Sequence, residues 1–151
     1  MSYIEQTFSL KKKISIVTGS CRGNGKEIAL ALGKSGSELI LVDQNEKLSK
    51  FNEKLISQGI KSTYYLCDLS NLDETKKIFN QIIKKHRTID ILVNNAGITK
   101  SNNFENYSRN DWIDTFNVNL FSIFLIIQCV SYAMKKKRKG SIINITSLNA
   151  E

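Results

Sequence analysis

The feature that most constrains the fold is a short apolar run that leads directly into a glycine-rich turn. Residues 14–18 (Ile-Ser-Ile-Val-Thr) are mostly β-branched and apolar, so they predict a short buried strand. Gly19, Gly23 and Gly25 follow at once, and residues 26–34 then predict a helix that packs on an apolar sheet. A strand, a glycine-rich turn and a helix in this order present free backbone N–H groups to a phosphate.

The spacing of these glycines is Gly-x-x-x-Gly-x-Gly, which alone is a weak signal because glycine-rich turns are common. Glycines here allow a sharp turn, a close approach of the backbone to a pyrophosphate, and tight packing of helix on strand. Cys21 lies near the start of a helix, where the pKa of a thiol can fall; the alternative is a small residue that fills the turn. We expect the phosphate-binding turn to comprise Gly19, Cys21, Arg22, Gly23, Asn24 and Gly25.

An acidic residue follows at the distance that such a turn requires. The second apolar run, residues 38–43, ends in Asp43, which lies 18 residues after Gly25. A carboxylate at this position can accept hydrogen bonds from an adenosine ribose. The alternative is a loop Asp that caps the helix beginning near Asn45.

Apolar runs and helical patterns alternate along the whole chain. The expected strands are residues 14–18, 38–43, 62–68, 89–93 and 141–145, and the expected helices are residues 26–34, 46–57, 71–85 and 108–137. This alternation predicts an α/β fold of the doubly wound, Rossmann-like type, with a parallel sheet in the order 3-2-1-4-5 and helices on both faces. We expect one domain over residues 1–151, with a ligand crevice at the carboxyl ends of the first and fourth strands.

The helix expected over residues 112–134 is unusually apolar. Only Ser122 interrupts the apolar residues from Leu120 to Ile127, so we expect the helix to be buried on two sides. It is judged too short, and too polar at Asn117, Asn119 and Gln128, to span a membrane. One face is expected to meet the sheet and the other a partner subunit.

Cysteine usage and charge bear on compartment and partners. No signal peptide is seen, and Cys21, Cys67 and Cys129 have neither metal-ligand nor disulfide spacing, so we expect reduced thiols, a cytoplasmic location and no metal. The net charge is +8, but the lysines are spread along the sequence with few aromatic residues among them. The densest run, residues 135–139, ends a helix with Gly140 at the C′ position, where cations match the helix dipole. We therefore expect no nucleic-acid partner.

Several motifs, in order, resemble those of the short-chain dehydrogenase/reductase family. Residues 18–25 (Thr-Gly-Ser-Cys-Arg-Gly-Asn-Gly) resemble its Thr-Gly-x-x-x-Gly-x-Gly cofactor turn, and residues 94–97 are its Asn-Asn-Ala-Gly motif. Asn119, in Asn-Val-Asn-Leu, resembles the helix Asn of the family's catalytic tetrad. Ser147, after Ile-Ile-Asn-Ile-Thr, resembles its catalytic Ser. The resemblance covers residues 8–151.

The resemblance implies an NAD(P)-dependent oxidoreductase that transfers a hydride between nicotinamide and an alcohol or ketone. It implies that Asn119 keeps a water in a proton relay and that Ser147 holds the substrate oxygen. Taken singly, Asp68 is also compatible with an ordinary strand-end residue, Asn119 with a helix Asn bonded to a carbonyl, and Ser147 with a loop serine. On the cofactor side, the resemblance implies contacts from Asp68, Leu69, Asn95, Ala96 and Gly97.

Two features depart from the family pattern. Its acid/base pair, Tyr-x-x-x-Lys, lies just downstream of the catalytic Ser, and no such pair follows Ser147 before the sequence ends at Glu151. We therefore expect a fragment truncated after the fifth strand, which binds nucleotide but catalyses poorly alone. Asn24 stands where the family usually has Ile or Leu, so the packing beside the nicotinamide is expected to differ. No tyrosine within this sequence can take the place of the family's Tyr, because none is followed by a Lys four residues later in a helix after the fifth strand. The tyrosines considered are Tyr64, Tyr65, Tyr107 and Tyr132.

Asp43 and Arg22 point to different cofactors. Asp43 would repel a 2′-phosphate and accept ribose hydroxyls, which favours NAD, whereas related NADP enzymes have a basic residue at the position of Arg22. We expect NAD, with NADP the less favoured. The segments at both ends look most like those of gluconate and related sugar-acid dehydrogenases, with 3-oxoacyl-carrier-protein reductases as the alternative; the expected substrate is a small alcohol or ketone, such as a sugar acid, polyol or 3-oxoacyl compound.

The apolar helix and the missing acid/base pair bear on assembly and on alternative functions. A full-length form is expected to be a homodimer or homotetramer that pairs through the helix at residues 112–134. Because the Tyr and Lys are missing, the alternative is a non-catalytic dinucleotide-binding or interaction module. A third hypothesis, nucleic-acid binding through the basic surface, is disfavoured by the dispersed lysines.

Overall fold

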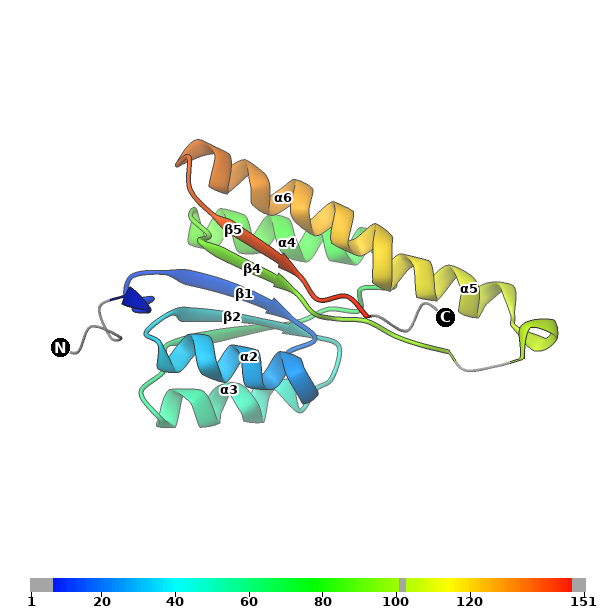
Figure 1. The fold of residues 1–151 in the computed structure, drawn as a ribbon, viewed down its shortest axis with the longest axis horizontal. Helices are drawn as coiled ribbons and strands as arrows, with labels where there is room; N and C mark the ends of the chain where they lie inside the picture. The colour runs from blue at the N-terminus through cyan, green and yellow to red at the C-terminus, as the bar shows by residue number, and fades with distance from the viewer. Residues whose placement is uncertain (1–6, 101–102, 148–151) are drawn as a thin grey trace.

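The computed structural model describes residues 7–100 and 103–147 of the chain, and a parallel five-stranded sheet forms its centre. The strands lie in the order β3-β2-β1-β4-β5 (Figure 1). This result confirms the predicted fold class and strand order. The strand bounds are β1 Ile14–Thr18, β2 Glu38–Asp43, β3 Ser62–Leu66, β4 Ile91–Asn94 and β5 Ser141–Asn144.

Helices cover both faces of the sheet (Figure 1). Alternate residues of the central strands point to opposite faces: Val17 and Leu39 pack with α2 and α3, and Ile16 and Ile40 pack with α4 and α6. The helix bounds are α2 Gly23–Lys34, α3 Leu48–Ser57, α4 Leu72–His86, η1 Phe104–Asn106, α5 Arg109–Phe116, the π-helical turn η2 Asn117–Phe121, and α6 Ser122–Lys136.

Element boundaries differ from the expected ones by a few residues. Helix α2 begins at Gly23, inside the glycine-rich turn, rather than at residue 26. Strand β3 ends at Leu66, which leaves Cys67 and Asp68 in the loop that follows. Strand β4 includes Asn94. In each case the change brings backbone from the predicted motifs to the carboxyl edge of the sheet.

The expectation that the long helix is too short to cross a membrane is wrong. Segments α5, η2 and α6 run on without a break from Arg109 to Lys136, 28 residues that pass as a membrane span by length and composition. One face packs on the sheet layer through Ser122, Ile126 and Val130. The opposite face is open: Phe124 is 63% exposed, and 22% of the apolar window is buried within the chain.

The end of α6 also differs from expectation, because Arg138 and not Gly140 occupies the left-handed C′ position. Arg138 has φ +53°, its N–H donates to the carbonyl of Lys135 at 3.1 Å, and the N–H of Lys139 donates to that of Met134 at 3.2 Å. These two bonds form a Schellman motif. Gly140 is required for a different reason, since a Cβ there would collide with the side chain of Met134.

Candidate nucleotide-binding site

A cavity of about 300 Å³ lies at the carboxyl edge of the sheet, around the ends of β1, β2 and β4. Ten of the twelve predicted cofactor-binding residues line it: Gly19, Arg22, Gly23, Asn24, Asp43, Asp68, Leu69, Asn95, Ala96 and Gly97. The other two belong to the same turn: Cys21 is half-buried and Gly25 is buried. Segments separated by up to 78 residues in the sequence therefore meet at one place, as the predicted strand order requires.

The glycine-rich turn is shaped by close backbone contacts. Gly19 has φ +63°, and a Cβ on it would lie 2.8 Å from the Cα of Ala96. A Cβ on Gly25 would collide with the carbonyl oxygen of Gly19 and with the side-chain amide of Asn95. Only residues without a Cβ fit both positions, so the turn after β1 can lie directly against the turn after β4.

Hydrogen bonds join these two turns. The hydroxyl oxygen of Thr18 accepts from the backbone N–H groups of Asn95 at 3.0 Å and Ala96 at 3.1 Å. In return, Nδ2 of Asn95 donates to the carbonyls of Thr18 at 3.1 Å and Gly19 at 3.2 Å. Thr18 is buried, so these bonds satisfy its hydroxyl and carbonyl groups in the absence of solvent. They fix the floor of the cavity.

The start of α2 leaves backbone donors available to a ligand. The first N–H groups of a helix have no partner within it, and the N-cap residue Arg22 makes no side-chain capping bond. No acidic residue lies in the first turn of α2. In contrast, α4 and α5 are capped, since Asn71 accepts from the N–H of Glu74 and Ser108 accepts from that of Asp111. An uncapped helix start beside a cavity fits the phosphates of a dinucleotide.

Asp43 is held rigidly at the other side of the turn. Its Oδ2 accepts from the N–H of Cys21 at 2.9 Å, and its Oδ1 accepts from the N–H of Asn45 at 3.0 Å. The bond to Asn45 is the local contact expected if Asp43 only caps the segment that follows it. The bond to Cys21, however, links β2 to the glycine-rich turn. Burial, together with the charge of Asp43, raises the pKa of the Cys21 thiol, which favours the interpretation of Cys21 as a small residue that fills the turn over an activated thiol.

The π-helical turn η2 positions Asn119. The carboxamide of Asn119 exchanges two hydrogen bonds with the backbone of Ile98: Oδ1 accepts from its N–H and Nδ2 donates to its carbonyl, each at 2.9 Å. Two residues earlier, Nδ2 of Asn117 donates to the carbonyl of Ser70 at 2.9 Å. These bonds tie one helix to the loops after β3 and β4, and a π turn is a common device at functional sites.

Ser147 lies three residues beyond the end of β5 and is exposed. It is not among the described residues that line the cavity. The strand before it is tied to β4, since Nδ2 of Asn94 donates to Oδ1 of Asn144 at 2.8 Å. The catalytic roles expected for Ser147 and Asn119 stay predictions.

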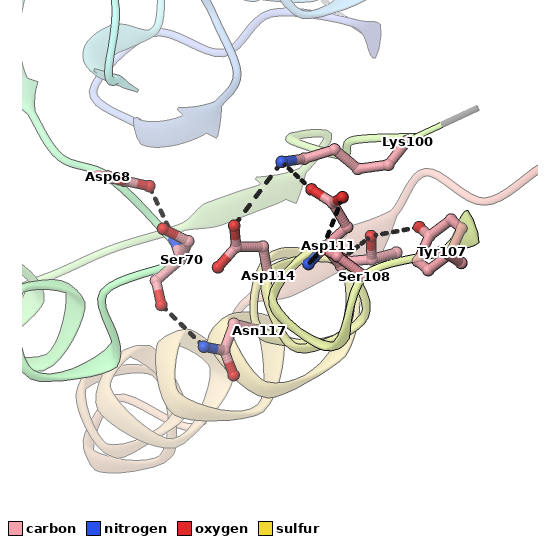
Figure 2. A network of polar contacts seen from close by, with 9 residues as sticks. Asp68, Ser70, Lys100, Tyr107, Ser108, Asp111, Asp114 and Asn117 are labelled. Carbon is pink, nitrogen blue, oxygen red and sulfur yellow. Dashed lines mark hydrogen bonds and ion pairs between the residues drawn. The ribbon is translucent and has the colours of Figure 1, made fainter. Parts of the chain in front are cut away.

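A polar network lies at the start of α5, and Figure 2 shows Lys100 reaching toward two carboxylates of that helix. Its Nζ lies 2.8 Å from Asp111 and 3.7 Å from Asp114. The hydrogen bond to Asp111 raises the pKa of Lys100, and this bond with that of Ser108 lowers the pKa of Asp111. The pairs hold the segment after Gly97 against the start of α5.

The family follows from a comparison with known proteins. A profile of the short chain dehydrogenases matches residues 13–151. The chain belongs to the short-chain dehydrogenase family. It is 36% identical over 148 residues to 2-dehydro-3-deoxy-D-gluconate 5-dehydrogenase of Bacillus subtilis, covering 98% of this chain and 58% of that one. It is 33% identical over 138 residues to a 3-oxoacyl-acyl-carrier-protein reductase of Staphylococcus epidermidis, covering 90% and 57%.

Solved structures of short-chain dehydrogenases have the same fold. A gluconate 5-dehydrogenase from Burkholderia cenocepacia, in complex with NADP and tartrate, has a TM-score of 0.86 at 29% identity, over 96% of this chain and 57% of that one. A metagenomic short-chain oxidoreductase in complex with NADP has a TM-score of 0.88 at 30% identity, over 94% and 64%. The chain spans a little over half the length of the curated relatives it matches.

Four residues of this short-chain dehydrogenase chain line the cavity without having been expected there: Gln44, Cys67, Ile98 and Val118. The first three are sequence neighbours of predicted site residues. Their position just after the end of a parallel strand is the sequence signal that could have placed them at the cavity. Thr18 was read only as part of a motif. Its role depends on a partner 77 residues away, which no local pattern reveals.

Tyr132 and Lys136 have the spacing of the short-chain dehydrogenase acid/base pair but not its place. Both lie on α6 before the fifth strand, and Tyr132 is 74% exposed. Helix α6 ends at the amino edge of the sheet, opposite the cavity (Figure 1). The Tyr-x-x-x-Lys spacing of these two residues therefore arises by chance, because the end of α6 is rich in lysine.

Proposed function

We propose that this chain is the nucleotide-binding part of an NAD(P)-dependent oxidoreductase that acts on an alcohol or ketone. The observation that carries the proposal is the cavity in which an uncapped helix start, a turn without Cβ atoms and a fixed carboxylate face one another. When bound, the dinucleotide supplies the site for hydride transfer at its nicotinamide.

Each group in the cavity then has a defined task. The N–H groups at the start of α2 bind the phosphates, and Asp43 binds the adenosine ribose. Asp68 and Leu69 border the adenine. The joined turns around Asn95 hold the nicotinamide end of the dinucleotide. Beside them, the two hydrogen bonds between Asn119 and Ile98 fix the η2 turn to the loop after β4.

We further propose that NAD binds more tightly than NADP. Asp43 supports this order, because a fixed carboxylate repels a 2′-phosphate. The exposed Arg22 on the same turn, and the NADP in the two structures described above, act against it. Titration calorimetry with NAD⁺ and NADP⁺ tests the order directly. In Asp43→Ala the preference should move toward NADP, whereas a wild-type chain that binds NADP more tightly contradicts the proposal.

The substrate proposed for the whole protein is a sugar acid or polyol, with a 3-oxoacyl compound as the alternative. The names of the similar relatives support both classes. Turnover is measured with gluconate, 5-ketogluconate and an acetoacetyl thioester, by nicotinamide absorbance. Tight nucleotide binding without turnover supports the non-catalytic module for this 151-residue chain, and failure of a folded chain to bind any nucleotide contradicts both proposals.

For assembly, we propose that the open face of α5–η2–α6 pairs with a second copy. Its exposed apolar side chains support this, since patches of this kind mark contact surfaces. Light scattering after gel filtration is the measurement, and a monodisperse monomer at high concentration would count against the proposal. The exposed apolar residues are Trp112, Ile113, Phe116, Leu120, Phe121, Phe124 and Tyr132.

A further inference from the structure

The amino edge of the sheet, opposite the cavity, gathers the loops that lead into the strands. The N–H of Glu38 donates to the carbonyl of Lys13 at 2.9 Å, which aligns the starts of β1 and β2. On the other side, the N–H of Asp90 donates to the carbonyl of Ile14, and that of Ser141 to the carbonyl of Asp90, each at 2.9 Å. The residues just before each strand therefore form one line across the molecule.

The helices end at the same edge, because each runs antiparallel to the strands (Figure 1, left side). Thirteen of the 22 lysines and arginines of the chain come together there. We call this set the basic row; it consists of the lysines and arginines within residues 11–13, 34, 61, 84–87 and 135–139. The sequence had indicated dispersed lysines, and the fold collects them.

Few acidic groups offset this charge. Within the part of the chain that the structure describes, the row is paired through two carboxylates. Glu38 lies 2.6 Å from Lys61, and Asp90 lies 2.7 Å from Lys137 and 3.4 Å from Lys13. The ten other cations of the row form no ion pair with a described residue. His86 adds no charge at neutral pH, since burial lowers its pKa.

Helix dipoles account for part of the row only. Lysines in the last turns of α2, α4 and α6 complement the negative helix ends. The cations of residues 11–13 and 61 lie outside helices and gain nothing from a helix dipole in this way. Lys12, Lys13 and Lys61 border a hollow of about 360 Å³ between α2 and the start of β3.

We propose that the basic row binds the sugar–phosphate backbone of a nucleic acid without reading its bases. Five strands spaced about 4.8 Å apart give a row roughly 20 Å long, which matches about six phosphates of one strand. Eleven of the thirteen cations are lysines, which act as point charges toward phosphates. Among residues 7–100 and 103–147, the row carries no run of exposed aromatic side chains on which bases would stack.

A nucleic acid fits this surface better than a membrane or a protein does. Membrane-surface binding combines basic with inserted apolar residues, yet most exposed apolar side chains of the described residues lie along α5, η2, α6 and β5. Among the described residues, Phe8 lies beside the row at 68% exposure, and the ring of the half-buried Tyr65 lies under Lys85. The buried core of a protein interface is depleted in lysine. The proposal is independent of the proposed dehydrogenase function.

The test is fluorescence anisotropy with a labelled single-stranded RNA of mixed sequence, at a series of salt concentrations. The wild-type chain should bind, with log affinity falling linearly with log salt. The row variant changes Lys84, Lys135, Lys136 and Lys139 to Gln. The matched control changes Lys50, Lys76, Lys77 and Arg109 to Gln, so both variants lose four charges from exposed positions.

We expect the row variant to lose at least tenfold in affinity and to lower the salt slope by about 2–3, since each lost phosphate contact removes roughly 0.7. The control should stay within about threefold. Circular dichroism checks folding, and a second row variant, with Lys11, Lys12 and Lys34 changed to Gln, should also weaken binding. Saturating NAD⁺ should leave binding unchanged because the cavity lies at the other edge.

Four results would overturn the proposal: no binding at about 50 mM salt, equal losses in the row variant and the control, displacement of RNA by NAD⁺, or binding to phosphatidylserine vesicles but not to RNA. Equal losses would show an effect of net charge alone. Displacement by NAD⁺ would place RNA in the cavity, and binding to vesicles alone would identify a membrane surface.

Discussion

The two edges of the sheet are built on different physical principles. At the carboxyl edge, Gly19 and Gly25 let backbones touch, and Thr18 and Asn95 join the turns by short hydrogen bonds. At the amino edge, thirteen cations are grouped around two carboxylates, Glu38 and Asp90. Short-range contacts fail when one atom is changed, whereas a field summed over many charges weakens gradually. A single substitution should therefore act strongly at the first edge, whereas the loss of a single exposed cation should act weakly at the second.

The largest single effect is expected for Thr18→Val, which removes the oxygen that accepts from two backbone N–H groups. Both partly buried donors would lose their acceptor, so the free energy of unfolding should fall by about 2–4 kcal/mol. Urea denaturation measures it. Thr18→Ser keeps the hydroxyl and should recover most of the loss. If Thr18→Val cost less than about 1 kcal/mol, these bonds would not hold the turns together.

Gly25→Ala should come next, because its Cβ would collide with the carbonyl of Gly19. Overpacking of this kind costs about 1–3 kcal/mol, and displacement of the turn should weaken NAD⁺ binding at least tenfold in calorimetry. The control is Gly59→Ala near the amino edge, where φ is +77° and a Cβ would meet nothing within 4 Å. It should cost about 1–2 kcal/mol in strain and leave nucleotide affinity intact. Equal losses of affinity in both variants would refute the steric account.

At the amino edge, Asp90 should be the sensitive residue, because its side chain is only 12% exposed and contacts two lysines. Burial raises the pKa of its carboxyl, but hydrogen bonds from Lys137, from the N–H of Ile14 and from Lys13 outweigh this and lower the pKa. The lowered pKa gives stability that is present above about pH 4, the unfolded value, and is lost as pH falls through the folded value.

Asp90→Asn should therefore lower the unfolding free energy at pH 7 by about 1–2 kcal/mol. Below about pH 4 the difference from wild type should narrow. Thermal melts from pH 3 to 7 provide the measurement, with Glu53→Gln, an exposed residue of α3, as control. A difference that stayed constant over this range would mean that the ionised carboxylate is not what stabilises the edge.

The smallest effect is expected for one exposed member of the basic row. Lys136→Gln should change stability by less than about 0.5 kcal/mol and RNA affinity by less than about fivefold, because nine other unpaired cations remain. Lys137→Gln, which removes a partner of Asp90, should cost more stability. If Lys136→Gln and Lys137→Gln had the same effect on stability, the partly buried Lys137–Asp90 pair would contribute no more than an exposed, unpaired lysine. The proposed difference between the two edges would then be contradicted.

Local patterns were enough to predict most of the fold and most of the site. The alternation of strands and helices predicted the sheet order, and ten of twelve predicted cofactor-binding residues line the cavity. Predictions failed where a distant partner decides the outcome. Arg138 and not Gly140 is the C′ residue, and Gly140 instead lies against Met134. Thr18 was overlooked because its partners follow β4.

The sequence by itself determined the strands, the glycine-rich turn and the acidic residue at the end of β2, because hydrophobic period and the absence of a Cβ act within a few residues. Tertiary structure alone decided which distant groups meet. It joined Thr18 to Asn95, inserted the π turn that directs Asn119 to Ile98, and gathered cations from five separate segments at one edge. The physical reason is that such contacts depend on sheet order and on helices running antiparallel to strands, which no local pattern of residues records.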